Sequence, residues 1–157
     1  MNQTDNTFAE ASCCVQQLEK SLTGIKCLDE ITGGGLPKGR PTLLSGSAGS
    51  GKTLLSMQFI AQGALRGEPG VFMAFEETPD ELTKNFASLG FDLNDLIARK
   101  LVLIDYVRIE SSEIEETGEY DLEGLFIRLG SAIDSINAKR VVLDTIEVLF
   151  SGFETLP

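Results

Sequence analysis

The residues best suited to chemistry form one continuous loop, Gly46-Ser47-Ala48-Gly49-Ser50-Gly51-Lys52-Thr53. This run fits the pattern G-x-x-x-x-G-K-[ST], in which backbone N–H groups surround a polyphosphate. Glycines permit that close approach because they carry no side chain. Lys52 can reach the β- and γ-phosphates, and the hydroxyl of Thr53 can take a coordination position on Mg²⁺. The loop predicts a site for a nucleotide with its Mg²⁺; the alternative is a chance glycine turn before Lys-Thr.

The sequence on either side of this loop supports the nucleotide-binding interpretation. A short apolar run, Thr42-Leu43-Leu44, predicts a strand before the loop. Apolar residues recur at helical spacing over residues 53–66 after it, which predicts a helix. A strand, a glycine loop and a helix in this order would place the phosphates at the positive end of the helix.

Three further apolar runs predict the rest of a sheet, over residues 71–75, 101–104 and 141–143. Strands that are apolar without alternation are typical of parallel sheets buried on both faces. Helices are expected between them. Thr78-Pro79-Asp80-Glu81 is a capping box that predicts a helix ending near Gly90, and residues 121–137 form the clearest amphipathic helix. The expected class is α/β, with a mostly parallel sheet flanked by helices.

Acidic residues follow these apolar runs, at the sheet edge where open α/β folds bind ligands. Asp144 follows a β-branched run downstream of the phosphate loop, as a Mg²⁺-orienting aspartate must. The adjacent Glu76 and Glu77 are candidate proton acceptors, because neighbouring carboxylates can raise one another's pKa. The alternative for the pair is the acidic first turn of the next helix. For Asp105, a turn or helix-cap role is favoured over a functional one.

Composition narrows the class of protein. The 157 residues suit one domain, and 13 Lys+Arg against 24 Asp+Glu give a net charge of −11, which argues against a general nucleic-acid partner. There is no apolar run of the ~20 residues that span a bilayer and no signal pattern, so we expect a cytoplasmic protein with no membrane partner. The chain has no histidine to complete a zinc site, which favours free thiols for Cys13, Cys14 and Cys27.

Two segments are expected to be loosely structured. Residues 1–20 are polar and acidic and are interpreted as a flexible leader. Residues 110–123 contain many acids and no Lys or Arg, which favours a solvated loop over a docking surface for a basic partner.

Several motifs together resemble the KaiC family, the RecA-like ATPases of the circadian clock and their bacterial relatives. They are Thr23-Gly24-Ile25 with Leu28-Asp29, the run Gly34 to Arg40, the phosphate loop, Gly67 to Phe72, and Phe75-Glu76-Glu77-Thr78-Pro79. The similarity covers about Thr23 to Phe150, and the glutamate pair followed by Thr-Pro is its family-specific part. Cys27 departs from the pattern, because the family usually has glycine there.

The resemblance implies a RecA-like fold and slow ATP hydrolysis. Glu76 and Glu77 would be the catalytic carboxylates, and Asp144 would organise Mg²⁺. It also implies two fused domains, hexameric rings, clock or signalling partner proteins, and autophosphorylation on a Ser/Thr pair in a second domain. The alternatives are a nucleotide-binding interaction module that does not hydrolyse ATP and, disfavoured by the charge, a DNA recombinase or helicase-type ATPase.

The resemblance also carries an expectation about chain topology. In RecA-like folds a later strand inserts between the phosphate-loop strand and the strand that bears the Asp144-type residue. The sequence ends at Pro157, soon after that second strand. We therefore expect residues 21–157 to be a RecA-like domain that is incomplete at its C-terminus.

Overall fold

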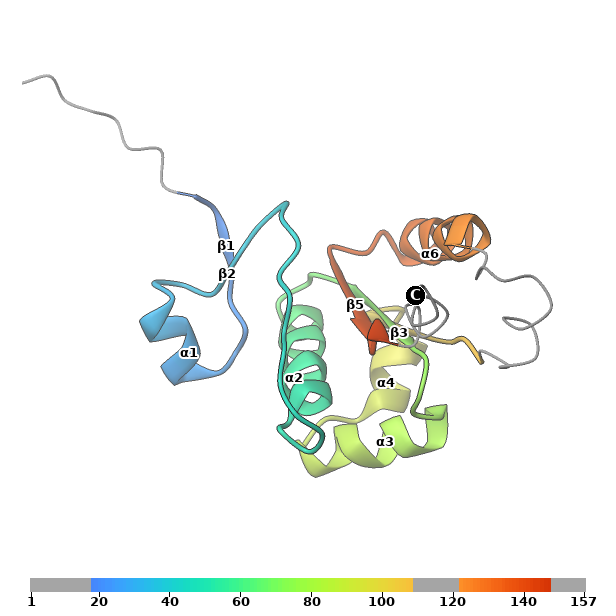
Figure 1. The fold of residues 1–157 in the computed structure, drawn as a ribbon, viewed down its shortest axis with the longest axis horizontal. Helices are drawn as coiled ribbons and strands as arrows, with labels where there is room; N and C mark the ends of the chain where they lie inside the picture. The colour runs from blue at the N-terminus through green and yellow to red at the C-terminus, as the bar shows by residue number, and fades with distance from the viewer. Residues whose placement is uncertain (1–17, 109–121, 148–157) are drawn as a thin grey trace, which may run out of the picture.

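The computed structural model describes residues 18–108 and 122–147, and its centre is a parallel three-stranded sheet. The strands are β3 (Gly70–Ala74), β4 (Val102–Tyr106) and β5 (Arg140–Asp144), in the order β4-β3-β5 (Figure 1). All five residues of β3 are buried. The three apolar runs were therefore interpreted correctly, because a central parallel strand is covered on both faces.

Helices cover both faces of this sheet (Figure 1). On one face lie α2 (Lys52–Leu65), α3 (Pro79–Ser88) and α4 (Leu93–Ala98), whose buried side chains form a cluster with Phe72. On the other lies α6 (Leu122–Ile136), where Leu125 packs in a second cluster with Met73. Successive residues of β3 thus enter opposite cores, as strand geometry requires. The predicted α/β class, with a parallel sheet flanked by helices, is confirmed.

The helix boundaries follow local capping signals. Thr78 caps α3, since its hydroxyl accepts a hydrogen bond from the Glu81 backbone N–H at 3.4 Å and the Glu81 carboxylate accepts from the Thr78 N–H at 2.8 Å. Gly90, with φ +83°, follows the helix in the left-handed conformation that glycine favours. The helix predicted over residues 121–137 is α6. The short helix α4 was not predicted, although Asp92 caps it by accepting from the Asp95 N–H at 3.1 Å.

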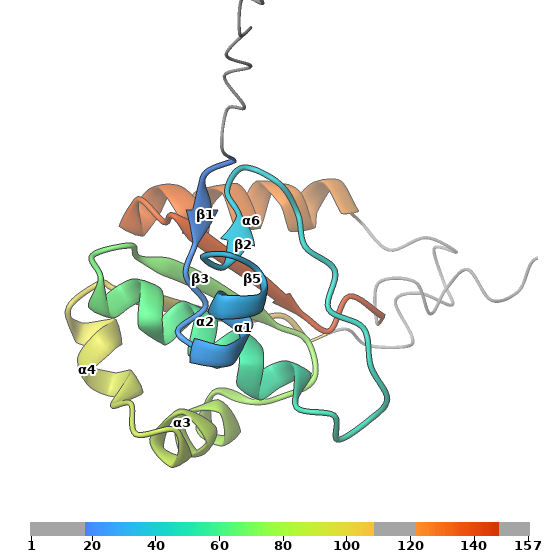
Figure 2. The same ribbon diagram turned by 90° about the vertical axis from the view of Figure 1, so that its left-hand side faces the viewer.

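The N-terminal described residues form a small unit beside α2. It consists of β1 (Lys20–Ser21), α1 (Lys26–Ile31) and β2 (Leu36–Pro37), with β1 antiparallel to β2. Figure 1 shows this unit on the side of α2 away from the sheet, and Figure 2 shows it from the front. In this unit α1 is six residues long, and each strand contributes two residues to the antiparallel pair.

The strand predicted at Thr42-Leu43-Leu44 is wrong in this structure. Residues 41–47 are assigned to no strand, and Leu43 is 75% exposed. In the described part of the chain β5 pairs with β3 alone, and no described strand lies between the other edge of β5 and residues 42–44. A strand needs a neighbour to satisfy its backbone groups.

Some expectations fall on residues whose structure is not described. Residues 1–17 of the predicted leader, the greater part of the acidic segment 110–123, Cys13 and Cys14 lie outside the described ranges. Cys27 is an exposed free thiol. Within the described ranges, no helix is both long and apolar enough to cross a membrane.

Candidate functional site

The glycine-rich loop ends where α2 begins, and its glycines have conformations that require them. Gly49 and Gly51 have φ values of +74° and +89°, in the left-handed region that side chains disfavour. At Gly46 the space is limited, since a Cβ there would lie 2.6 Å from the Ser50 Oγ and that side chain would have to move. The loop is exposed, and its backbone leads directly into the N-terminus of a 14-residue helix. This is the geometry of an anion-binding site.

Lys52 lies against this loop. Its Nζ donates hydrogen bonds to the carbonyl oxygens of Gly46 at 2.7 Å and Ser47 at 3.3 Å. These acceptors are neutral and exposed, so the ammonium can exchange them for the oxygens of an incoming phosphate, to which charge-assisted hydrogen bonds are stronger.

The register of the sheet brings the acidic candidates together. Ala74 of β3 is paired with Asp144 of β5, and the Phe75 N–H donates to the Asp144 carbonyl at 2.9 Å. The next residue, Glu76, therefore lies at the carboxyl end of β5. There the Thr145 hydroxyl donates to the Glu76 Oε1 at 3.0 Å.

Asp144 also meets the start of α2. It is 9% exposed, and burial raises the pKa of its carboxyl, while a hydrogen bond from the Thr53 side chain counteracts the rise. A hydroxyl and a carboxylate are hard oxygen ligands of the kind Mg²⁺ prefers. The described residues contain no group of three or more His, Cys, Asp or Glu side chains that could hold a metal ion. A Mg²⁺ at Thr53 and Asp144 would therefore take further ligands from phosphate and water.

Glu77 accepts a hydrogen bond from a different residue than Glu76 does. Its Oε2 accepts a hydrogen bond from the Asn85 Nδ2 at 2.7 Å. Burial raises the pKa of Glu77, the Asn85 bond opposes this, and the nearby Asp144 carboxylate adds to the rise. The first turn of α3 carries Asp80 and Glu81 instead, so the pair lies before the helix. This argues against the alternative in which the two glutamates belong to the acidic first turn.

Asp105 is not part of this group. It lies inside β4, and its carboxylate pairs with the Arg128 guanidinium of α6, with Nε donating at 3.0 and 2.9 Å. The predicted turn or cap role is therefore wrong, and the residue instead ties α6 to the sheet.

Two polar residues at the site were not identified from the sequence. Thr145 follows Asp144 directly, so its position was a usable signal. Asn85 gave no such signal. It lies eight residues after Glu77 and reaches it only because α3 folds the chain back toward the end of β3.

The parallel sheet, the glycine loop before α2 and the carboxylates at the strand ends define a class, the RecA-like P-loop nucleoside triphosphatases. The profile described as "ATPase: KaiC" matches residues 21–155. The chain belongs to the KaiC family of ATPases.

The names of curated relatives agree with this family assignment. The chain is 62% identical over 138 residues to "Circadian clock protein KaiC2" of Synechocystis sp., a match that covers 87% of this chain and 24% of the relative. It is 41% identical over 151 residues to "Circadian clock oscillator protein KaiC" of Parathermosynechococcus lividus, covering 96% of this chain and 28% of the relative. The protein of the same name in Synechococcus elongatus is 41% identical over 141 residues, covering 88% and 27%. The chain spans about a quarter of the length of these relatives.

Proposed function

We propose that this chain binds Mg-ATP and hydrolyses it slowly. The observation that carries the proposal is the meeting of three elements, since Thr53 of α2, Glu76 after β3 and Asp144 of β5 converge at one end of the sheet. Their side chains are a hydroxyl and two carboxylates, which are the groups that metal-assisted phosphoryl transfer to water requires.

In this proposal the loop and α2 hold the nucleotide. The backbone N–H groups of residues 46–53 surround the phosphates, and Lys52 leaves its carbonyl partners to bind them. Thr53 and Asp144 place Mg²⁺, which when bound neutralises charge that develops on the phosphate oxygens. Burial of Asp144 keeps competing water away from that position.

The attacking water is assigned to the glutamate pair. Glu76 orients the water and accepts its proton, and the hydroxyl of Thr145 fixes one of its carboxylate oxygens. Glu77, held by Asn85, assists from the neighbouring position.

For the whole protein we propose further properties that rest on the family. They are a cytoplasmic location, a hexameric ring of identical subunits, clock or signalling protein partners, and autophosphorylation. Their support is the resemblance and the clock function in the names of the relatives. The net charge of −11 favours protein partners over nucleic acid.

The test is calorimetry with ATP and Mg²⁺, followed by an assay of phosphate release, on the longest form that the reading frame encodes. Binding together with release that requires Mg²⁺ is the expected result. Binding without release would support the non-hydrolysing nucleotide-binding module instead. A chain that folds but binds no ATP would contradict the proposal.

A further inference from the structure

Residues 18–40, here called the strap, contribute little to the core of the domain. The buried apolar side chains of the described chain begin at Met57, and the buried residues of the strap are the polar Thr23 and Gly35, which has no side chain. The strap is organised by its own hydrogen bonds, with the Asp29 carboxylate accepting from the N–H groups of Thr23 at 2.8 Å and Gly24 at 3.0 Å. Apolar burial is the main force that attaches one part of a fold to another, and here it is small.

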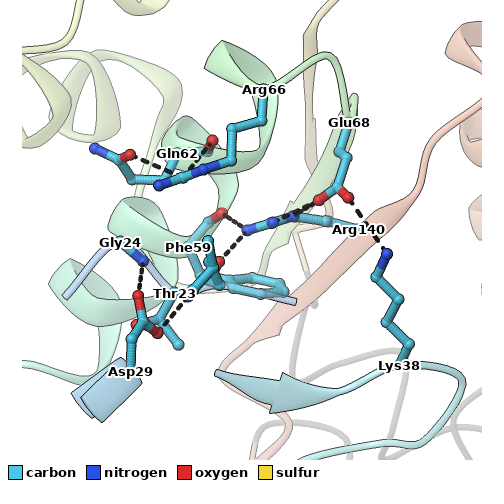
Figure 3. Close-up of polar contacts among 10 residues, drawn as sticks. Thr23, Gly24, Asp29, Lys38, Phe59, Gln62, Arg66, Glu68 and Arg140 are labelled. Carbon is cyan, nitrogen blue, oxygen red and sulfur yellow. Dashed lines mark hydrogen bonds and ion pairs between the residues drawn. The ribbon is translucent and has the colours of Figure 1, made fainter. Parts of the chain in front are cut away.

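One buried guanidinium joins the strap to the core. Arg140, the first residue of β5, is 3% exposed, and its Nη1 donates to the carbonyl oxygens of Leu22 in the strap at 2.8 Å and Phe59 in α2 at 2.7 Å. Its Nε donates to the Glu68 Oε2 at 2.8 Å, and its charge lies 4.4 Å from the centre of the Phe59 ring (Figure 3). The strap, α2 and β5 therefore meet at one side chain.

The sequence of α2 leaves room for this contact. Gly63 lies inside α2, which ends at Leu65, and glycine is unfavourable inside a helix. A Cβ on Gly63 would lie 2.3 Å from the Arg140 Cδ and 2.4 Å from its Nε. A glycine is thus required because the side chain of Arg140 passes directly over the helix backbone.

The other described polar links between strap and core are weaker. Lys38 and Glu68 form an ion pair at 3.6 Å in which the Lys38 side chain is 44% exposed, and such pairs contribute little. Gln58 Nε2 lies 3.5 Å from the Gly24 carbonyl, at the limit of a hydrogen bond. An open hollow of about 390 Å³ is lined by strap residues, among them Leu22 and Asp29, and by Arg66 after α2.

We propose that the strap is a separable unit latched to the nucleotide-binding core by Arg140. When Arg140 releases the Leu22 carbonyl, the strap can leave without disturbing the apolar clusters around β3. Once detached it has no core of its own, and a segment of this length without one does not remain folded. The strap continues through residues 41–45 into the phosphate loop, so its release would also free the upstream side of that loop. The inference does not depend on the proposed function.

The latch requires arginine rather than a positive charge alone. Its planar group donates to two carbonyls and a carboxylate in different directions while stacking on a ring, and a lysine ammonium cannot reproduce this fixed set of donors. Arg140→Lys therefore keeps the charge opposite Glu68 and loses the geometry. Arg99→Lys is a matched control, because Arg99 pairs with Asp95 on the exposed surface of α4.

The first measurement is native-state hydrogen exchange on the unchanged protein, in the longest form that its reading frame encodes, at low urea concentrations. We expect amides of the strap to exchange through an opening that leaves β3 and α3 protected. If strap and β3 amides exchanged together in a single opening at every urea concentration, the strap would be part of the core and the proposal would be overturned.

The second measurement compares the two lysine variants by hydrogen exchange. Arg140→Lys should raise strap exchange by about tenfold or more, because charge-assisted hydrogen bonds at a buried group are lost, while β3 stays protected. Arg99→Lys should leave the strap unchanged. Equal strap protection in both variants would contradict the latch. If Arg140→Lys does not fold, the exchange pattern of the unchanged protein decides alone.

Discussion

Asn85 of α3 holds Glu77 in place, because its Nδ2 donates a hydrogen bond of 2.7 Å to the Glu77 Oε2. This bond links α3 to the segment that follows β3. Glu76, the adjacent residue, is held instead by Thr145 after β5. Two neighbouring carboxylates are thereby held by residues of different elements. This separation is the structural basis for giving them different roles.

Asn85→Asp should impair turnover without impairing nucleotide binding. The substitution keeps the shape of the side chain but replaces the amide donor with a second carboxylate, which repels Glu77. A hydrogen bond to a charged group contributes ~1.5–3 kcal/mol, so kcat should fall roughly tenfold or more. Asn94→Asp, on the exposed face of α4, is the control for added charge. Unchanged kcat in Asn85→Asp would show that the position of Glu77 does not matter.

Lys52→Ala should weaken ATP binding in any form of the protein that folds. The ammonium of Lys52 donates to two loop carbonyls, and its loss would remove charge-assisted hydrogen bonds to phosphate. The dissociation constant should rise at least about tenfold. Calorimetry measures this directly, with Lys84→Ala, an exposed lysine on α3, as the control. Equal ATP affinity in both variants would remove the phosphate-binding role from Lys52.

Stability should fall in acid partly through Glu68. A hydrogen bond from Arg140, aided by the charges of Arg140 and Lys38, holds the pKa of Glu68 below its usual range. A depressed pKa means that the folded state binds the proton less well than the unfolded state does. The stabilisation is therefore present above the unfolded-state pKa and is lost as pH falls through the folded-state pKa.

Thermal melts of the unchanged protein and of Glu68→Gln, from about pH 6 to about pH 3, test this. The difference in stability between the two should shrink as the pH falls. Burial raises the pKa values of Asp144 and Glu77, which has the opposite sign, but both groups are common to the two proteins and cancel in the difference. A difference that stays constant with pH would show that the charge of Glu68 is not involved.

The sequence predicted the phosphate loop, the strands β3 to β5 and the helices α3 and α6 because their signals are local. Apolar runs and the Thr78 capping box act within a few residues. The position of Thr42-Leu43-Leu44 was not predictable in the same way, since a strand forms only when a neighbour pairs with it. Arg140 gave no signal at all, because its partners Leu22, Phe59 and Glu68 are distant in sequence.

The topology expected of a RecA-like sheet remains a proposal with its own test. Val141 on β5 is 39% exposed and Leu43 is 75% exposed, which is consistent with a further strand between β5 and residues 42–44. Hydrogen exchange on the longest form that the reading frame encodes tests this. If a strand pairs with the free edge of β5, the β5 amides should be protected as strongly as those of β3. Weakly protected β5 amides beside protected β3 amides would contradict this topology.

The central claim is that Glu76 acts on the attacking water, and Glu76→Gln tests it most directly. Glutamine keeps the size of the side chain and its acceptor for Thr145 but cannot take a proton. With ATP affinity and turnover measured on the same preparation, the account predicts a fall in turnover of ~10²-fold or more with ATP affinity nearly unchanged. If Glu77→Gln lowered turnover far more than Glu76→Gln, the two roles would be reversed. If neither substitution lowered turnover, the glutamates would not take part in hydrolysis and the account would be contradicted.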